Sequence, residues 1–408
     1  MKALVLAGGL PQIALLKDLR SRGIATVLCD YYENPVARPY ADVFYQVSTL
    51  DIPAVTRVAV EEKVDFLITV CTDQALLTVA QVSEQLELPC YISYETARNV
   101  TNKSYMKQIF AEKGISSARF AVMGRLEPEQ IRHLRYPLIV KPVDCNSSKG
   151  VQKLTRPEEL PAAFAAAVAL SRTRTAIVEE FIEGPELSVD VYVQEGVAHV
   201  LSISELDKLP IEDKFIIFRA KSPTEMSDGL MAHIRATAQQ ITDAFGLKNS
   251  PMLIQMISDG QKGYVLEFSA RTGGGEKYVM IPKVSGFDPV KAVVELTLGG
   301  RPSVPAKRPA KHLFATEFLY CKDGIFHHLE NFQELKTEGV LAEYYCFHSS
   351  GTAFHGIGSS GDRVGGFSIV AESREKLQKL HRQAVQELRV IDNRGRDMLR
   401  RDLLPDLY

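Results

Sequence analysis

The first hundred residues alternate short apolar runs with helical segments, and this alternation limits the fold more than any other feature of the chain. The apolar runs, which fit strands buried on both faces, are 2–7, 25–30 and 65–70. The amphipathic segment 11–22 fits a helix between the first two runs, and segment 73–85 fits a helix after the third. This order predicts a parallel, Rossmann-like sheet. Gly8 and Gly9 end the first run without GxGxxG spacing, so we expect a tight turn there, and a nicotinamide-dependent oxidoreductase is disfavoured.

The composition is that of an ordinary globular protein, with 45% hydrophobic and 24% charged residues, and 408 residues suggest two or three domains. The 48 basic and 50 acidic residues give a net charge of −2 and form no basic block, so we expect no nucleic-acid partner. No apolar run approaches the ~18 residues of a membrane span, and we expect no membrane partner. The six cysteines are scattered without a CxxC pair, which argues against a disulfide framework or zinc site and predicts a cytoplasmic location.

Beyond residue 100 the pattern changes to mixed helices and antiparallel strands. A helix over 102–113 is expected to end at Gly114, and residues 187–206 alternate like two strands with a turn at Glu195-Gly196. The other expected helices are 157–171, 225–245 and 373–390. The other expected strands are 119–123, 138–143, 175–182, 252–258 and 263–270. Residues 301–310 resemble a linker because they are rich in Pro, Lys and Arg.

The segment YPLIVKPVDCNSSKGV (136–151) combines an apolar strand with a small, polar loop. The strand delivers Lys141, which can neutralise a phosphate group as a point charge. The loop presents Ser147, Ser148, Lys149 and Gly150, whose hydroxyls, ammonium and approachable backbone N–H groups suit phosphate oxygens. The GxxxxGK[ST] spacing of a P-loop is missing. Taken alone, a lysine before a solvated turn explains the pattern equally well.

A second signal is the strand exit AIVEEFIEGPE (176–186). A nucleotide base needs an apolar slot and a backbone edge of donors and acceptors. The expected base-binding residues are Glu179, Glu180, Phe181 and Ile182. After the Gly184-Pro185 turn, Glu186 could accept hydrogen bonds from a ribose. Solvated surface carboxylates are the simpler alternative for the glutamates.

The third signal is a hairpin whose turn is Asp259-Gly260. This turn places Gln255 opposite Glu267, and Glu267, Ser269 and Arg271 share one face because side chains alternate along a strand. The carboxylate, amide and hydroxyl oxygens would suit a hard cation such as Mg²⁺. Arg271 could grip an anionic substrate or a phosphoryl group in transfer. A plain sheet face with a Glu267–Arg271 ion pair is the alternative.

Taken in order, these segments resemble the ATP-grasp superfamily, and within it the branch of carbamoyl-phosphate synthetase large subunits, biotin carboxylase and L-amino-acid ligases. The resemblance covers residues 1–300 and, more loosely, the tail. It implies that Lys103 and Lys141 bind phosphates, that residues 144–150 form a mobile loop over them, and that Glu180–Ile182 holds adenine. It further implies that Glu186 contacts the ribose and that Glu267 bridges the metal ions, with Arg271 on the charge of the substrate or transition state.

The resemblance also implies an α/β architecture of three parts. These are a Rossmann-like domain at 1–100, an ATP-grasp domain at 101–300 and a C-terminal α+β subdomain at 301–408 that completes the core. Two subdomains of the ATP-grasp domain would grip ATP, with a mobile lid at about 115–185. The chain departs from the family twice, because Gln255 stands where an acidic residue is usual and Ser269 where Asn is often found. The first change removes one negative charge from the metal site.

The reaction implied is ATP-dependent joining of a carboxylate to an amine through an acyl phosphate, with release of ADP and phosphate. The cofactors would be ATP and Mg²⁺, or Mn²⁺ in its place, and the substrates small molecules. Residues expected to face the substrate are Arg271, Gly273, Gly274 and Asp73. A homodimer is possible. The alternatives are a bicarbonate-dependent carboxylase with the same nucleotide site, and a catalytically silent ATP-binding module.

Overall fold

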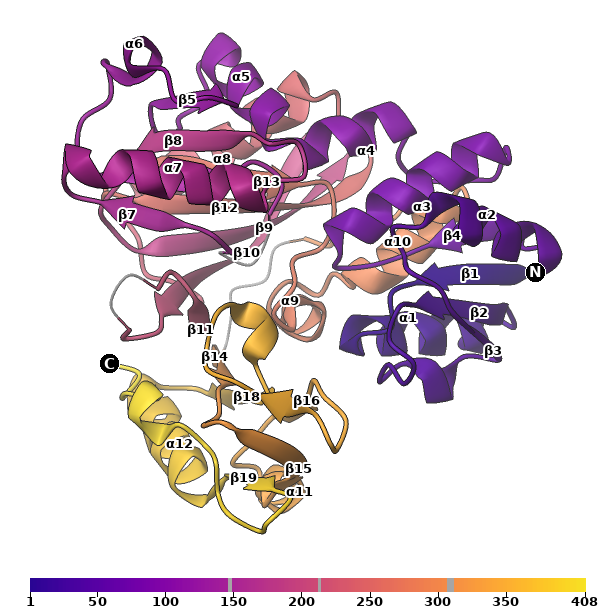
Figure 1. The fold of residues 1–408 in the computed structure, drawn as a ribbon. Coiled ribbons are helices and arrows are strands. Elements are labelled where there is room, and N and C mark those ends of the chain that lie inside the picture. The colour runs from indigo at the N-terminus through magenta and orange to yellow at the C-terminus, as the bar shows by residue number, and fades with distance from the viewer. Residues whose placement is uncertain (146–148, 212–213, 307–311) are drawn as a thin grey trace.

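The computed structural model describes residues 1–145, 149–211, 214–306 and 312–408. Three regions are visible in Figure 1: the N-terminal sheet on the right, two sheets with their helices on the upper left, and the tail below. The α/β class and the Rossmann-like start predicted from the sequence are confirmed. In the part of the chain that the structure describes, none of the helices has both the length and the apolar character to cross a bilayer.

The N-terminal region is a four-stranded parallel sheet in the order β3-β2-β1-β4. Its strands are β1 (Lys2–Leu6), β2 (Ala25–Asp30), β3 (Val43–Gln46) and β4 (Phe66–Ile68), and its helices are α1 (Leu10–Ser21), α2 (Ile52–Glu61) and α3 (Asp73–Gln85). Both faces of the sheet are buried, as its continuous apolar runs require. Helix α10 (Pro289–Thr297) comes from much later in the chain and packs Val290, Val293 and Val294 against the same core as α1.

A smaller antiparallel sheet follows, in the order β5-β8-β6-β7. Its strands are β5 (Phe120–Met123), β6 (Leu138–Pro142), β7 (Gln152–Leu154) and β8 (Ala176–Glu180), and α6 (Pro128–Ile131) and α7 (Leu160–Leu170) accompany them. Leu160, Phe164 and Ala167 of α7 pack against this sheet.

The largest sheet has eight strands in the order β13-β12-β9-β10-β11-β14-β18-β16. Its first five strands are β9 (Glu186–Gln194), β10 (Val197–Lys208), β11 (Ile217–Ser222), β12 (Ser250–Ser258) and β13 (Gly263–Ser269). Helices α4 (Tyr94–Thr101), α5 (Lys103–Lys113) and α8 (Asp228–Ala244) bury their apolar sides against one face of it, and α9 (Lys277–Ser285) lies on β10. The expected antiparallel pair with its turn at Glu195-Gly196 is confirmed as β9 and β10.

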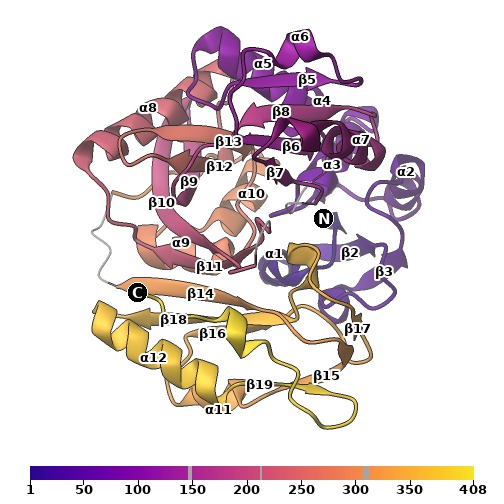
Figure 2. The same cartoon turned by 60° about the vertical axis from the view of Figure 1, so that its left-hand side comes forward.

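The tail continues this sheet and is not a separate layer. Strands β14 (Leu313–Leu319), β18 (Gly365–Ala371) and β16 (Glu343–Cys346) extend it beyond β11. A three-stranded sheet of β15 (Gly324–Glu330), β17 (Ala353–Phe354) and β19 (Arg389–Asp392) lies below, with α11 (Phe332–Thr337) and α12 (Arg374–Glu387) (Figure 2). The described residues also include the short 3₁₀ turns η1 (Arg38–Tyr40), η2 (Pro157–Glu159), η3 (Ser360–Asp362) and η4 (Arg401–Leu403).

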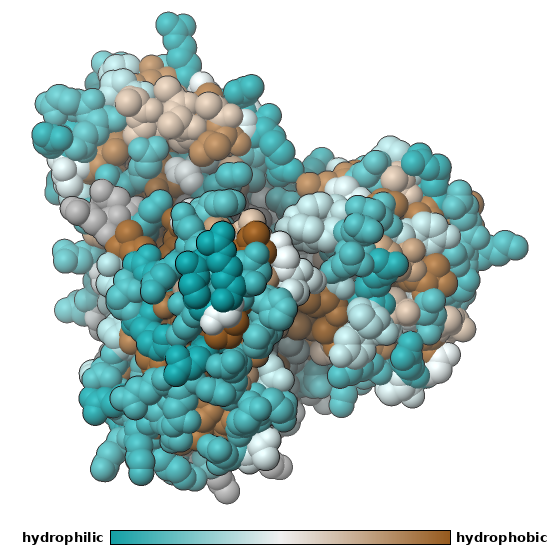
Figure 3. Space-filling model, turned by 60° about the horizontal axis from the view of Figure 1, so that its bottom comes forward, coloured by the Kyte–Doolittle hydropathy of each residue, from teal (hydrophilic) through white to brown (hydrophobic). Residues whose placement is uncertain are grey.

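Seen from below, the tail presents a mostly hydrophilic surface with small, separated hydrophobic patches (Figure 3). The domain boundaries at 100 and 300 stay predictions. Two features of the packing were not anticipated: α10 completes the N-terminal core, and β14, β18 and β16 share a sheet with strands β9–β13. Part of the expected linker, residues 307–311, lies outside the described residues.

Candidate active site

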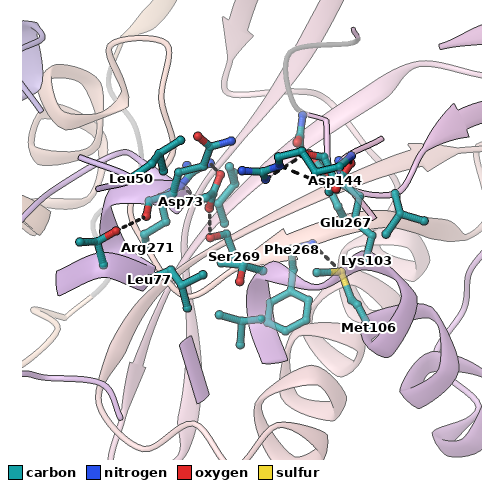
Figure 4. Close-up of a pocket in the computed structure, with 18 of the residues that line it drawn as sticks. Leu50, Asp73, Leu77, Lys103, Met106, Asp144, Glu267, Phe268, Ser269 and Arg271 are labelled. Carbon is teal, nitrogen blue, oxygen red and sulfur yellow. Dashed lines mark hydrogen bonds and ion pairs between the residues drawn. The ribbon is translucent and has the colours of Figure 1, made fainter. Parts of the chain in front are cut away.

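Three adjoining cavities lie where the sheets and the N-terminal region meet. One of about 150 Å³ lies between the small and large sheets, one of about 280 Å³ reaches α3 and α5, and one of about 530 Å³ extends toward the tail. Gln255 and Glu267 line all three, so the cavities meet at these two side chains. Figure 4 shows the cavity of about 280 Å³, called the middle cavity below, with Asp73 and Arg271 on one side and Lys103 and Glu267 on the other.

Lys103 is placed by the start of α5, as the sequence predicted. Asn102 caps this helix by accepting hydrogen bonds from the backbone of Ser104 and Tyr105, and Gly114 ends it in the left-handed conformation (φ 65°). The Lys103 ammonium lies 2.9 Å from the Glu267 carboxylate. Burial disfavours the charged form of both groups, but each charge stabilises the charged form of its partner. The pKa of Lys103 is therefore raised and the pKa of Glu267 is lowered.

Lys141, at the end of β6, belongs to a buried group of three charges. Its ammonium contacts one oxygen of Glu179, and Lys107 lies 2.8 Å from the other oxygen. Burial disfavours ionised Glu179, but the two lysines outweigh it and lower its pKa to about 2. Burial lowers the pKa of Lys107 despite Glu179, since one carboxylate serves two ammonium groups. The side chains of Lys107 and Glu179 are 1% and 4% exposed, so Glu179 is not a solvated surface carboxylate.

The strand exit after β8 lines the cavity between the two sheets. Glu180, Phe181 and Ile182 all contribute to its wall, together with Lys149. The N–H of Phe181 donates to the carbonyl of Pro137, and Lys153 lies 3.8 Å from the centre of the Phe181 ring. The wall therefore offers the apolar side chains of Phe181 and Ile182, which suit the apolar slot that a nucleotide base requires.

Two other nucleotide-site predictions have different outcomes. Ser147 and Ser148 lie outside the described residues. Gly150 is described and has φ 76°, and a Cβ there would come within 2.7 Å of Leu170, so glycine is required at this turn. The mobile loop over residues 144–150 and the lid at about 115–185 stay predictions.

Glu186, the expected ribose contact, lies at the start of β9 and lines the same cavity. Its carboxylate is 3.1 Å from the ammonium of Lys208 and accepts a hydrogen bond of 3.3 Å from the Gln255 amide. Burial raises the pKa of Glu186, and Lys208 counteracts this only in part. A ribose hydroxyl would therefore meet a carboxylate that Lys208 already holds in place.

The register predicted for the hairpin is confirmed, because Gln255 pairs with Glu267 across β12 and β13. Gln255, Glu267 and Ser269 line the middle cavity together. Only Glu267 supplies a charge among the three, and no cluster of three or more acidic, histidine or cysteine side chains with metal-binding geometry occurs within the described ranges. This donor set fits Mg²⁺ that takes most of its ligands from phosphates and water. It does not fit a cation held by protein alone.

Arg271 pairs with Asp73 and not with Glu267. The Arg271 Nε donates to Asp73 at 2.7 Å, a second guanidinium nitrogen contacts the other Asp73 oxygen, and Ser269 donates its hydroxyl to the same carboxylate. Burial opposes ionised Asp73, but Arg271 and Ser269 hold the pKa of the carboxyl below its ordinary value. This two-pronged ion pair fixes the guanidinium plane at the edge of the cavity.

The glycine segment after β13 separates into two roles. Gly274 lines the cavity of about 530 Å³ together with Gly275, and its contact with a substrate stays a prediction. Gly273 is packed behind the wall, where a Cβ would come within 3.0 Å of the Asp190 carboxylate and 3.2 Å of Lys277. Gly273 therefore supports the wall by allowing close packing, and direct substrate contact by this residue stays a prediction.

The charged residues of the site that sequence reasoning missed include Lys107, Asp144, Arg172, Lys208 and Arg363. Lys107 follows Lys103 by one helical turn, so a shared face of α5 was a usable signal. Lys208 lies diagonally across β9–β10 from Glu186, and such cross-strand neighbours interact. Arg172 and Asp144 lie 3.7 Å apart, but neither helical spacing nor cross-strand pairing links them in the sequence.

Comparison with known proteins agrees with this geometry. Residues 134–279 match the family described as ATP-grasp domain. The chain is 26% identical over 176 residues to a D-alanine–D-alanine ligase of Geobacter sulfurreducens, covering 42% of this chain and 55% of that protein. It thus spans about half the length of this curated relative. The resemblance inferred from the sequence is confirmed, and the chain carries an ATP-grasp domain.

Two solved structures share the fold over nearly the whole chain. An L-amino acid ligase from Bacillus licheniformis aligns with a TM-score of 0.77 at 20% identity, covering 96% of this chain and 98% of that one. A biotin carboxylase complex from Campylobacter jejuni aligns with a TM-score of 0.77 at 15% identity, covering 98% and 93%. The tail beyond residue 300 is therefore part of the architecture that these structures share.

Proposed function

We propose that this chain is an ATP-dependent, ADP-forming ligase that phosphorylates a substrate carboxylate and transfers the acyl group to an amine. The observation that carries the proposal is the meeting of three separately paired charges, Lys103–Glu267, Lys141–Glu179 and Arg271–Asp73, in connected cavities. Paired charges that already lie in place stabilise charge that develops on a transferred phosphoryl group without further reorganisation. The ATP-grasp match supports the same reaction class.

Each part of the site has a role in this reaction. Phe181 and the backbone beside it would hold the base, and Glu186 the ribose. Lys103 and Lys141 would neutralise phosphate oxygens, and Glu267, Gln255 and Ser269 would hold Mg²⁺, which supplies charge neutralisation on the phosphates when bound. A substrate carboxylate near Arg271 would attack the γ-phosphorus, forming its P–O bond as the bond to ADP breaks. The amine then displaces phosphate from the acyl carbon.

The small-molecule substrates, a homodimer and the cytoplasmic location belong to the same proposal. The cavity of about 530 Å³ that extends toward the tail is of the size that small ligands occupy.

The direct test is phosphate release from Mg-ATP, with identification of the nucleotide product, across amino acids, hydroxy acids, simple carboxylates and bicarbonate. We expect ADP and phosphate that rise with one acid and one amine. Lys141→Ala should lower turnover by ~10³-fold or more, whereas Lys113→Ala, on the exposed end of α5, should match the wild type. AMP and pyrophosphate as products would refute the assignment.

A carboxylase of the same fold is the second candidate, because the biotin carboxylase structure aligns as well as the L-amino acid ligase. Bicarbonate-dependent ADP release without an amine requirement would favour it. A silent ATP-binding module is the third, and Gln255 in place of an acidic ligand is the observation that favours it. ATP binding without stimulated turnover would support that outcome.

A further inference from the structure

Lys107 is a buried lysine that no step of the proposed reaction uses. It follows Lys103 by one turn of α5, and its ammonium lies 2.8 Å from one oxygen of Glu179 and 5.6 Å from the centre of the Phe120 ring. Among the residues that the structure describes, Glu179 supplies the only carboxylate within ion-pair distance of this ammonium. As far as the structure describes the walls of the three connected cavities, Lys107 is not part of them, so it does not contact a ligand there.

The stability of the fold does not account for the charge of Lys107. Moving an ammonium group out of water carries a large free-energy cost, and replacement of buried charges by well-packed apolar side chains is often neutral or stabilising. If an apolar side chain stood at this position, Glu179 would still have Lys141 as its partner. A methionine could fill the space beside Phe120 without the cost of desolvation. The positive charge therefore points to a role in the site.

The triad of Lys107, Glu179 and Lys141 differs from the neighbouring ion pairs in its balance of charge. Within the described residues, the pairs at Lys103 and Lys208 each join one cation to one anion and are neutral overall. The triad joins two cations to one anion. Burial raises the pKa of the Glu179 carboxyl, but the two lysines outweigh burial and lower this pKa to about 2, so the carboxylate stays ionised. The triad therefore carries one positive charge in excess.

This excess charge borders the cavity between the small and large sheets. Glu179 and Lys141 both line this cavity, and Lys107 contacts Glu179 from outside its wall. Lys107 thus offsets the carboxylate, and the ammonium of Lys141 is not cancelled on the cavity side. Without Lys107, Glu179 and Lys141 would form a neutral pair, and a phosphate group beside this pair would gain little attraction from it.

We propose that Lys107 is a positioning residue of the phosphate site, which offsets the charge of Glu179 so that Lys141 keeps its positive charge for the phosphates of the nucleotide. This inference rests on the nucleotide site of the proposed function and gives a role to a side chain that does not touch the ligand. Its signature is an effect on binding that grows with the number of phosphates. A lysine that only shaped the wall would change the binding of adenosine and of ADP by the same factor.

The test measures the binding of adenosine, AMP and ADP to wild type, Lys107→Met and the control Lys113→Met, which lies on the exposed end of α5. The dissociation constants come from displacement of a fluorescent ADP analogue in Mg²⁺ at one ionic strength. A unit charge at ~10 Å, in an effective dielectric constant of ~20, changes the binding of an anion ~10-fold. We therefore expect the Kd of ADP to rise ~10-fold in Lys107→Met, with the Kd of adenosine within twofold and that of AMP in between. Lys113→Met should match the wild type for all three ligands.

The outcomes separate the inference from the proposed function. An equal rise for adenosine and ADP in Lys107→Met, or no rise for ADP, overturns the inference while the nucleotide site stands. If adenosine displaces none of the analogue, AMP takes its place as the reference for ADP. If the wild type binds neither the analogue nor ADP, the nucleotide site of the proposed function fails, and the inference fails with it.

Thermal unfolding shows whether each variant is folded. Lys107→Met leaves Glu179 paired with Lys141, so no buried charge of the triad is left without a partner. If this variant does not fold, Lys107→Gln replaces it, because its amide can donate a hydrogen bond to Glu179 without adding charge. The same rise, confined to the nucleotides that carry phosphates, is expected for Lys107→Gln, and an equal effect on adenosine overturns the inference.

Discussion

Glu179 provides the sharpest prediction, because its removal leaves two buried ammonium groups facing each other. The side chain is 4% exposed and joins Lys107 to Lys141. A pKa lowered from 4.5 to about 2 corresponds to ~3 kcal/mol of folding free energy at neutral pH. Loss of one partner of a buried pair typically costs ~3–5 kcal/mol. For Glu179→Gln we therefore expect destabilisation of ~3 kcal/mol, which for a chain of 408 residues corresponds to a melting temperature lower by ~3–4 °C.

The same variant should also bind ATP more weakly, since Lys141 loses the carboxylate that holds it. Thermal unfolding and ATP titration of wild type and Glu179→Gln at pH 7 measure both effects. The control is Glu129→Gln, which removes an ion pair with Arg132 whose two side chains are 83% and 78% exposed, and which should leave melting unchanged. A melting temperature of Glu179→Gln within 2 °C of the wild type would show that the triad does not stabilise the fold.

The sign of the pH dependence follows from the lowered pKa of Glu179. A carboxyl whose pKa is lower in the folded state stabilises the protein above its unfolded pKa, here 4.5, and this contribution is lost as the pH falls toward 2. The gap in stability between wild type and Glu179→Gln should narrow below pH 4.5. A gap that stays constant between pH 7 and pH 3 would contradict this linkage.

Three further predictions concern other residues of the site and its wall. Gln255→Glu restores a second carboxylate beside Glu267, and Mg²⁺ titration of ADP formation should show half-saturation at severalfold lower Mg²⁺; an unchanged midpoint would place the metal elsewhere. Glu276→Gln removes a buried carboxyl whose pKa is raised by burial from 4.5 to about 7, so the stability of the wild type falls as the pH rises from 4.5 to 7. The variant should therefore melt at a higher temperature than the wild type at pH 8 but not at pH 4. Thermal unfolding at both pH values tests this. Asp73→Asn frees Arg271 from its two-pronged ion pair and should lower kcat by ~10–100-fold with the KM of ATP unchanged; steady-state kinetics showing an equal rise in the KM of ATP would assign Asp73 to nucleotide binding instead.

Local sequence rules predicted much of the site. The Asn102 cap and Gly114 stop fixed the ends of α5 and hence the position of Lys103. The Asp259-Gly260 turn fixed the hairpin register, which places Gln255 opposite Glu267. Both rest on hydrogen bonds and backbone angles within a few residues, so neighbouring residues alone are sufficient to determine them.

The partners of the charged residues were not predictable in the same way. Arg271 pairs with Asp73, 198 positions away, where the sequence left a Glu267–Arg271 pair open. The pairing of Glu179 with Lys107 also depends on elements that folding brings together.

The sequence by itself thus determined the fold class, the order of the motifs and the residue types that could contact ATP. Only the tertiary structure decided which charge pairs with which, that α10 completes the N-terminal core, and that the tail strands extend the central sheet. The physical reason is that backbone hydrogen bonding and side-chain periodicity act over a few residues. Desolvation and ion pairing depend instead on which distant segments exclude water together.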